Sequence, residues 1–469
     1  MTAFALELGL AGLIVGLFVA TLLARGEDRR WLGWVATAGV LGLTLLSLGL
    51  PEAGPRLGGA FVQDGLALFA KRLFLAAAFI GLLGGLSVAT ATFRRRAGEY
   101  HLLLLASLLG MLVLASARDV ILLFVAFELM SIPLYVLTGF AKRDGEAVEA
   151  SLKFFLVGSV SSAVMAYGLS FVYGAAGTSS LAGLARVVAG GDPLLVLGLL
   201  ATFAGLGFKI AAFPFHMWVP DAYEAGPTPF VAWLSVAPKA AGFVALFRIY
   251  LEGVGAGLAF WVPMAAALAA VTIVAGNLMA IPQQNAKRLL AYSGIAHIGY
   301  MLMGLAALSA SGTAMVLFYL VAYVFGNMGA FLVVEAVAQA EGTEHLSGLR
   351  GLAQRSPLLA LAMLLFLLSL GGIPFVAGFW AKLYVFWAAA TAGLYWLVFV
   401  GAVLTVVALF YYLVVAKRMY IEAPPPGGPL ALEPTLALAV VLCVVGVVAL
   451  GVYPRPVVAA ALRVAAPLF

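Results

Sequence analysis

The sequence predicts an all-α integral membrane protein with about 14 transmembrane helices, arranged as two inverted five-helix repeats that each contain a broken helix. Three observations lead to this fold class. Of the 469 residues, 64% are hydrophobic and only 10% are charged, whereas soluble domains carry roughly a quarter charged residues. The apolar residues gather in runs of about 20, the length that crosses a bilayer as a helix. Two of these runs are interrupted by Gly and Pro.

The apolar runs divide into fourteen segments. The longest, 66–93 and 357–388, could each be broken or tilted. No basic stretch of the kind that marks a cleavable signal peptide precedes the first run, so we expect residues 1–24 to stay as a membrane span. The segments are 4–24, 31–50, 66–93, 100–117, 119–140, 149–174, 194–219, 228–250, 255–281, 288–308, 312–338, 357–388, 393–418 and 432–452.

Helix-breaking residues lie inside two segments. Pro214 lies in FKIAAFPFHMWVP, and Gly371, Gly372 and Pro374 lie in LSLGGIPFVAGFW. Proline removes a backbone hydrogen bond, and interrupted spans are typical of ion sites in transporters, although Gly-Gly-Ile-Pro alone would also fit a packing kink. The interruptions lie about 170 residues, or five spans, apart, and an odd offset places two copies of a repeat in opposite orientations.

This spacing predicts four parts of the chain. An N-terminal three-helix segment covers 1–98, and a C-terminal helix and tail cover 421–469. The two five-helix repeats lie between them, at 99–251 and 252–420.

The basic residues predict an orientation. Of the 26 Lys and Arg, fourteen fall in loops after odd-numbered segments, and eight, including Lys71 and Arg248, fall at the other side. The positive-inside rule then places the odd-numbered loops in the cytoplasm and both termini outside. The net charge of +6 is spread over helix ends, which does not indicate nucleic-acid binding. The single cysteine, Cys443, excludes an internal disulfide and a cysteine-built metal site.

Four basic residues remain, and all are lysines within apolar segments. A charge at the bilayer centre costs roughly 2.5–3.5 kcal/mol on insertion scales, so such residues are rarely incidental. Lys153 lies near the end of its segment, and its ammonium could simply extend to the interface. Two further titratable groups lie within spans, although a lone buried histidine is often only a hydrogen-bonded core residue. The six candidates are Glu128, Lys153, Lys209, Lys239, His297 and Lys382.

The choice of lysine indicates the chemistry. Arginine keeps its proton in any protein site, whereas a desolvated lysine can release its proton and a nearby carboxylate can hold it there. His297 adds an imidazole, which ordinarily titrates near neutral pH. A line of such groups predicts a path for protons through the bilayer.

Four stretches together resemble the antiporter-like membrane subunits of respiratory complex I. They read FELMSIPLYVL, FKIAAFPFHMWVPDAYEAGPTP, SVAPKAAGF and QNAKRLLAYSGIAHIGYM, and the resemblance extends from about residue 60 to 420. Tyr223 in the stretch PDAY is the N-type form, where L-type, M-type and multisubunit cation/proton antiporter sequences usually have His. About seventeen residues follow the last segment, so we expect no long lateral helix of the L-type kind.

The resemblance implies a role for each candidate. Glu128 matches the fifth-helix glutamate that pairs with the lysine of the broken seventh helix, here Lys209. The other matches are Lys153 with the sixth-helix lysine, Lys239 with the connecting lysine of the eighth helix, His297 with the bridging residue of the tenth helix, and Lys382 with the exit-side residue of the broken twelfth helix.

The resemblance also implies partners. It places the chain in a bacterial inner membrane, in contact with lipid, as a subunit of NADH:quinone oxidoreductase beside M-type and K-type subunits. NADH, FMN, iron–sulfur clusters and quinone would bind other subunits, and this chain has neither a Gly-rich dinucleotide motif nor a cysteine set for a cluster. We expect proton translocation coupled to quinone reduction elsewhere, with no cofactor or metal and no redox chemistry on this chain.

Three other functions stay open. A stand-alone Na⁺ or K⁺/proton antiporter subunit would have similar helices and charges, although Tyr223 argues against it. A structural scaffold of the membrane arm would not need the full set of lysines. A solute permease would need a polar central cavity, and the spans contain few Asn, Gln or Asp.

Overall fold

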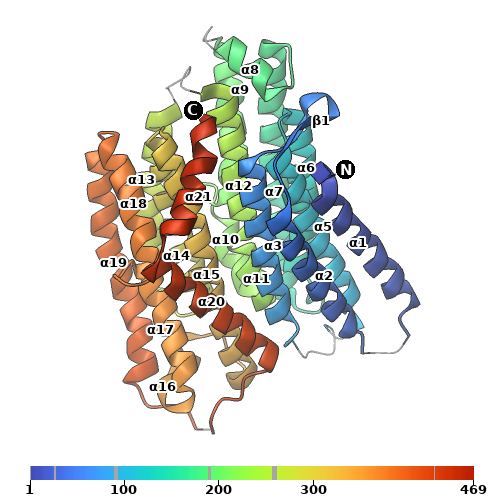
Figure 1. The fold of residues 1–469 in the computed structure, drawn as a ribbon. Coiled ribbons are helices and arrows are strands. Elements are labelled where there is room, and N and C mark those ends of the chain that lie inside the picture. Colours follow the sequence, from blue (N-terminus) through green and yellow to red (C-terminus); the bar gives the residue numbers. More distant parts are fainter. Residues whose placement is uncertain are drawn as a thin grey trace.

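The computed structural model describes residues 2–25, 28–88, 93, 95–188, 192–255, 261–426 and 428–469. Arg94, one of the loop residues counted above, lies outside the described residues. The chain forms a bundle of long helices that run roughly side by side, with one short antiparallel hairpin at its upper end (Figure 1). The prediction of an all-α membrane fold is confirmed, with this hairpin as a small addition.

Thirteen helices of the described chain are long and apolar enough to cross a membrane. A fourteenth crossing is divided between the shorter helices α17 (Pro357–Gly371) and α18 (Ala377–Thr391). The thirteen are α1 (Ala5–Leu23), α2 (Trp31–Gly49), α3 (Gly65–Gly85), α5 (Ala97–Ser116), α6 (Val120–Thr138), α7 (Gly145–Ala176), α9 (Pro193–Ile210), the run from α11 to η4 (Thr228–Val254), α13 (Trp261–Ala280), α14 (Ala286–Ala306), α15 (Ala310–Glu341), α19 (Tyr395–Tyr420) and α20 (Pro434–Val452). Shorter elements are β1 (Ala53–Arg56), β2 (Phe61–Gln63), α8 (Leu181–Val187), α10 (Trp218–Ala225), α16 (Leu352–Arg355) and α21 (Arg455–Ala465).

Aspartates at the edges of the apolar runs begin four of these helices. Asp64, Asp119, Asp144 and Asp192 accept hydrogen bonds from backbone N–H groups in the first turns of α3, α6, α7 and α9. A capping side chain satisfies an N–H group that has no partner within the helix. These carboxylates therefore mark helix starts at the ends of the bundle.

Both predicted helix interruptions are present. α9 ends at Ile210 before α10 begins, and α17 ends at Gly371 before α18 begins. The two upstream helices end in the same way, with Ala211 and Gly372 in the left-handed conformation, at φ values of 65° and 81°. In each case the N–H of the next residue bonds the carbonyl five residues earlier, at 2.9 and 3.0 Å. This shared end motif supports an internal duplication.

A third interruption was not predicted. The expected span 228–250 consists of α11 (Thr228–Leu234), α12 (Ala237–Leu246) and the π-helix η4 (Phe247–Val254), and a turn separates the first two. Pro238 in the first turn of α12 was the available signal, because its ring nitrogen donates no hydrogen bond. Every residue of the run except Glu252 is buried, so its irregular backbone is surrounded by protein.

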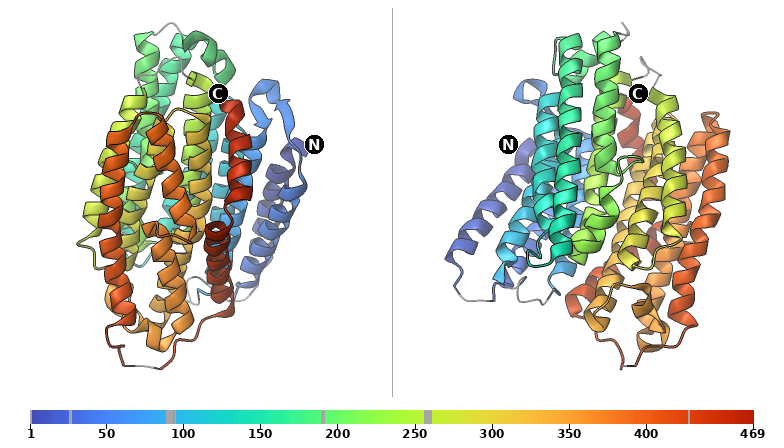
Figure 2. Two further views of the ribbon diagram at one scale, coloured as in Figure 1. Left: turned by 60° about the vertical axis from the view of Figure 1, so that its left-hand side comes forward. Right: turned by 180° about the vertical axis from the view of Figure 1, so that it is seen from behind.

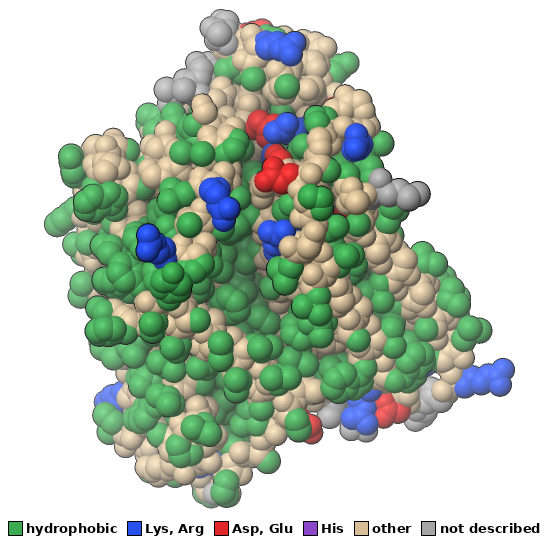
Figure 3. Space-filling view, viewed as in Figure 1, with side chains coloured by type: hydrophobic (Ala, Val, Ile, Leu, Met, Phe, Trp, Pro, Cys, Tyr) green, Lys and Arg blue, Asp and Glu red, His purple; other side chains and the backbone are tan. Residues whose placement is uncertain are grey.

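The outer surface fits a lipid environment. Hydrophobic side chains cover most of the visible face, and charged side chains gather in its upper part and along its lower edge (Figure 3). α1 and α2 form one edge of the bundle, whereas α18 and α19 form the opposite edge (Figures 1 and 2). Both chain ends lie toward the upper side, and the loops after odd-numbered spans form the lower side, called the odd-loop face below.

Candidate functional site: a line of buried lysines

Lys209 lies in the last turn of α9, immediately before the first interruption. It is 1% exposed, and its Nζ has no hydrogen-bond partner among the described residues. Instead, Nζ lies 5.2 Å from the ring centroid of Phe127 and 6.0 Å from that of Tyr135, both on α6. The faces of these rings attract a cation, but less strongly than a carboxylate would.

Glu128, next to Phe127 on α6, is partly buried and has a different partner. Its Oε1 accepts a hydrogen bond of 2.5 Å from Ser162 Oγ on α7. No ion pair joins Glu128 to Lys209 in the part of the chain that the structure describes. The pairing implied by the family resemblance is therefore not formed in this structure, although both residues border Phe127.

Lys239 lies at the start of α12, directly after the unpredicted interruption. It is also 1% exposed, its Nζ has no partner among the described residues, and it lies 5.3 Å from the ring centroid of Tyr223. A β-carbon at Gly294 would lie 3.3 Å from this Nζ and 2.8 Å from the hydroxyl of Tyr323. Glycine at position 294 thus leaves the space in which the lysine and the tyrosine approach each other.

His297 on α14 is joined to two tyrosines. Its Nδ1 lies 2.7 Å from the hydroxyl of Tyr319, and its Nε2 lies 3.4 Å from the hydroxyl of Tyr412. The same Tyr412 hydroxyl lies 2.5 Å from Ser293 Oγ. The imidazole therefore has a hydroxyl group at each ring nitrogen, which is an arrangement suited to passing a proton.

Lys382 on α18 contacts the end of the other half of its broken helix. Its Nζ donates to the carbonyl of Gly371 at 3.3 Å and lies 4.8 Å from the ring centroid of Tyr300, and the side chain is buried. Gly371 is the last residue of α17, where backbone carbonyls have no helical partner. The interruption thus supplies the acceptor that holds this ammonium.

Neighbouring contacts connect these residues into one line. A β-carbon at Gly242, one turn beyond Lys239, would lie 3.6 Å from Lys209 Cγ. Tyr323 borders Lys239 and lies next to His297, with ring centroids 5.1 Å apart and the rings tilted by 37°. Tyr300, which borders Lys382, lies 6.1 Å from His297 between ring centroids. The structure therefore brings together five of the six predicted residues through their neighbours.

Lys153 is the exception, because its side chain extends to the surface, which is the alternative that its position near the end of its segment left open. The side chain is 51% exposed and forms ion pairs with Glu149 at 2.8 Å and Asp221 at 3.1 Å. Asp221 also accepts from Arg288 at 2.9 Å. Burial alone would raise the pKa of Asp221, but its hydrogen bonds from Arg288 and Lys153 and their charges lower that pKa. Lys153 thus belongs to a charged cluster at the odd-loop face.

Two other basic residues were assigned to helix ends, and this is wrong. Lys71 is fully buried in α3, where its Nζ pairs with Glu7 of α1 at 2.6 Å and donates to Gln63 at 3.3 Å. Glu7, an acidic residue inside the first predicted span, was the signal for this pair. The second residue is Arg248 in η4, whose side chain is also fully buried.

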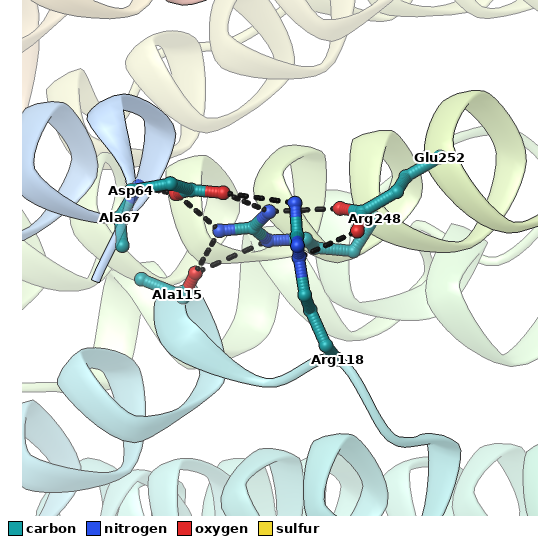
Figure 4. A network of polar contacts seen from close by, with 6 residues as sticks. All are labelled: Asp64, Ala67, Ala115, Arg118, Arg248 and Glu252. Atoms are coloured by element: carbon teal, nitrogen blue, oxygen red, sulfur yellow. Dashed lines mark hydrogen bonds and ion pairs between the residues drawn. The ribbon is translucent and has the colours of Figure 1, made fainter. Parts of the chain in front are cut away.

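Arg248 is the centre of a charged network, shown in Figure 4. Its two terminal nitrogens each lie 2.7 Å from Asp64, the capping residue of α3, and one lies 2.8 Å from Glu252. Arg118 pairs with Glu252 at 2.6 Å. Burial alone would raise the pKa of Asp64, but hydrogen bonds from Arg248 and its charge lower that pKa overall. This network joins the N-terminal segment to the span that carries Lys239.

The fold and the line of lysines define an ion-translocating membrane protein of the antiporter-like type. Residues 117–408 match the family described as "NADH:quinone oxidoreductase/Mrp antiporter, TM". "NADH-quinone oxidoreductase subunit N" of Moorella thermoacetica is 42% identical over 99% of this chain and 98% of its own length. The subunit N of Heliobacterium modesticaldum is 41% identical over 97% of both chains. The chain belongs to the NADH-quinone oxidoreductase subunit N family.

Solved structures agree with this assignment. A chain in the structure of respiratory complex I from Thermus thermophilus with bound aureothin superposes with a TM-score of 0.84 at 35% identity, covering 98% of this chain and 99% of that one. A chain of the Mrp complex from Dietzia superposes with a TM-score of 0.89 at 23% identity, covering 99% and 97%. The second likeness shows the fold alone. The fold therefore does not distinguish complex I N subunits from Mrp antiporter subunits, whereas sequence identity does.

Proposed function

We propose that this chain translocates protons as the N subunit of NADH:quinone oxidoreductase, along the line Glu128, Lys209, Lys239, His297 and Lys382. The observation that carries the proposal is the environment of the lysines. Three fully enclosed amines lie beside helix interruptions, and among the described residues none of them forms an ion pair. A permanently charged group would be costly there, whereas an amine that alternates between two protonation states suits the site.

Glu128 acts as the switch in this proposal. In the present structure its carboxylate is bonded to Ser162, and Lys209 meets only aromatic ring faces. Rotation of the carboxylate toward Lys209 would favour the ammonium, and its return to Ser162 would release the proton. Quinone reduction elsewhere in the complex supplies the energy for this alternation, and the proton moves through Lys239 and His297 to Lys382.

The orientation and partners follow from the same proposal. The odd-loop face lies in the cytoplasm and both termini lie in the periplasm, which the excess of basic residues in the odd-numbered loops supports. M-type and K-type subunits are the neighbours in the membrane arm, and the NADH, flavin, iron–sulfur and quinone sites lie on other subunits. The four predicted parts, 1–98, 99–251, 252–420 and 421–469, remain part of this proposal, as does a contribution of Lys153.

Replacement of Lys239 by alanine in the assembled complex tests the function. We expect NADH-driven proton uptake into vesicles to fall below about a tenth of the wild-type rate, because loss of a proton-transfer group typically costs 10²–10⁴-fold at that step. Lys142→Ala is the matched control, since Lys142 is an exposed loop lysine. Wild-type turnover and an unchanged number of protons per electron in assembled Lys239→Ala complex would refute the proposed path.

A further inference from the structure

A cavity of about 590 Å³ opens on the odd-loop face and reaches inward between α11, α14 and α15. Exposed residues at the N-terminal end of α7, such as Asp144 and Glu146, line its outer part. Its inner wall contains the buried side chains of Lys287 and Glu335, which are 2% and 8% exposed. The cavity thus connects the outer solution to two enclosed titratable groups that the line of lysines does not include.

Of these two groups, Glu335 alone lacks an ion-pair partner within the described chain. Lys287 Nζ pairs with Glu344 at 2.6 Å and donates to the carbonyl of Gly226 at 3.0 Å. Glu335 accepts a hydrogen bond from Gln339 Nε2 at 2.7 Å, the side chain of Thr228 also interacts with it, and the charge of Lys287 acts on it without forming an ion pair. A buried carboxyl group bonded to a neutral amide can exchange its proton without breaking an ion pair.

Glu335 begins a row of polar residues along α15, called the α15 stripe below. Its members are Tyr319, Tyr323, Asn327 and Glu335, which are separated by four or eight residues and are all buried. Each step of four residues rises about 6 Å and turns about 40° around the helix, so the row winds around α15 over a length of about 24 Å. The inner members reach the line of lysines: Tyr323 borders Lys239, and Tyr319 bonds His297.

Buried polar atoms without a hydrogen-bond partner among the described residues lie along this stripe. They include the hydroxyls of Tyr323 and Tyr223, Asn327 Oδ1 and Trp233 Nε1. Phe331 lies on α15 one turn from Asn327 and one turn from Glu335, and it packs against Tyr223 with ring centroids 5.8 Å apart. Buried polar atoms normally have a partner, and ordered water commonly supplies it. Unsatisfied groups in a row between a cavity and a buried amine mark a route that water can occupy.

We propose that Glu335 takes up protons from the cavity and that the α15 stripe delivers them to Lys239. The inference rests on the proposed function, which it extends by naming the uptake residue. One proton from water converts the Glu335 carboxylate to the carboxylic acid. One proton then passes along the hydroxyl and amide groups to the neutral amine of Lys239, which becomes the ammonium, and Glu335 returns to the carboxylate.

The test compares Glu335→Gln with Glu146→Gln in the assembled complex, reconstituted in vesicles. Glu335→Gln keeps the carbonyl oxygen that accepts from Gln339 but cannot gain or lose the proton, and we expect proton uptake to fall below about a tenth of the wild-type rate. Glu146→Gln removes a carboxylate from the outer part of the same cavity and should leave the rate unchanged. Glu335→Asp should restore uptake at least in part.

A second variant tests the route independently of any structural effect that a substitution at position 335 has. Asn327→Leu keeps the side-chain volume but removes the polar groups at the middle of the stripe, and we expect a similar loss of uptake in assembled complex. Normal pumping by Glu335→Gln or Asn327→Leu, beside a pumping defect in Lys239→Ala, would overturn the α15 route and leave the proposed function standing. Normal pumping by all three would overturn both. If only the Glu335→Gln complex fails to assemble, proton uptake by the Asn327→Leu complex decides whether the α15 route stands.

Discussion

Replacement of Asp64 by asparagine should destabilise the chain by removing a charge from a buried pair. Asp64 makes two hydrogen bonds of 2.7 Å to Arg248, whose side chain is fully buried, and it caps α3 through the N–H of Ala67 at 2.9 Å. Asparagine caps a helix about as well as aspartate. The Asp64→Asn variant therefore removes the charge while it keeps the cap.

The expected loss in the free energy of unfolding depends on which partners Arg248 keeps in the variant. Removal of one partner from a buried ion pair typically costs 3–5 kcal/mol. Here Arg248 keeps Glu252 at 2.8 Å and the carbonyl of Ala115 at 2.9 Å, so we expect a smaller loss of about 2–3 kcal/mol. Asp64→Ala also loses the cap, which should cost about 1 kcal/mol more.

The lone cysteine provides an assay that reports on this chain. Cys443 is buried in α20, which packs against α3, and its alkylation by a thiol reagent can be followed by mass spectrometry of the purified complex. When opening is fast, the alkylation rate follows the opening equilibrium. A loss of 2–3 kcal/mol predicts roughly 30- to 150-fold faster alkylation. Asp119→Asn is the control, because Asp119 caps α6 and forms no ion pair among the described residues. A rate in Asp64→Asn within about threefold of that control would refute the reasoning.

Two further predictions use the assays already described. The stabilisation from Asp64 should be constant between about pH 8 and 5. The pKa of Asp64 is lowered from 3.8 in the folded chain, so the stabilisation is present above pH 3.8 and is lost as the pH falls through the lower folded pKa. A wild-type alkylation rate that already rises at about pH 6, and rises less in Asp64→Asn, would contradict this prediction. Gly294→Ala should reduce NADH-driven proton uptake in assembled complex, because its β-carbon would lie 2.8 Å from the Tyr323 hydroxyl and overpacking costs about 1–3 kcal/mol. Gly12→Ala, whose β-carbon would meet nothing within 4 Å, is the control, and equal rates in the two variants would count against a role for this space.

The sequence predicted the features that arise from local chemistry. Apolar runs identified the spans, and Pro214 and Gly371 identified two interruptions, because proline and glycine act on their own helix. Pro238 carried the same kind of signal for the third interruption. The interruption was not predicted because the surrounding run is apolar on average, and mean hydropathy does not register the loss of a single backbone hydrogen bond.

The features that were missed depend on contacts distant in sequence. Lys71 and Arg248 were placed at helix ends because their positions suit an interface, yet Glu7 and Asp64 pair with them inside the bundle. An acidic residue within the first span hinted at one of these pairs, but pattern alone does not show which basic residue meets it. Glu335 was missed for a related reason, since it lies near a predicted span boundary and only the packing of α15 buries it.

The backbone dipoles at the helix interruptions also influence in which direction a proton would pass between Lys239 and Lys382. Lys239 lies in the first turn of α12, where the unpaired N–H groups and the helix dipole oppose a positive charge. Lys382 donates to the last carbonyl of α17, where the dipole attracts a positive charge. Both side chains are buried, so water screens these dipoles little. On the proposed path, this difference would favour transfer of a proton from Lys239 through His297 toward Lys382. The bias would come from the two interruptions, because among the described residues neither amine contacts a carboxylate.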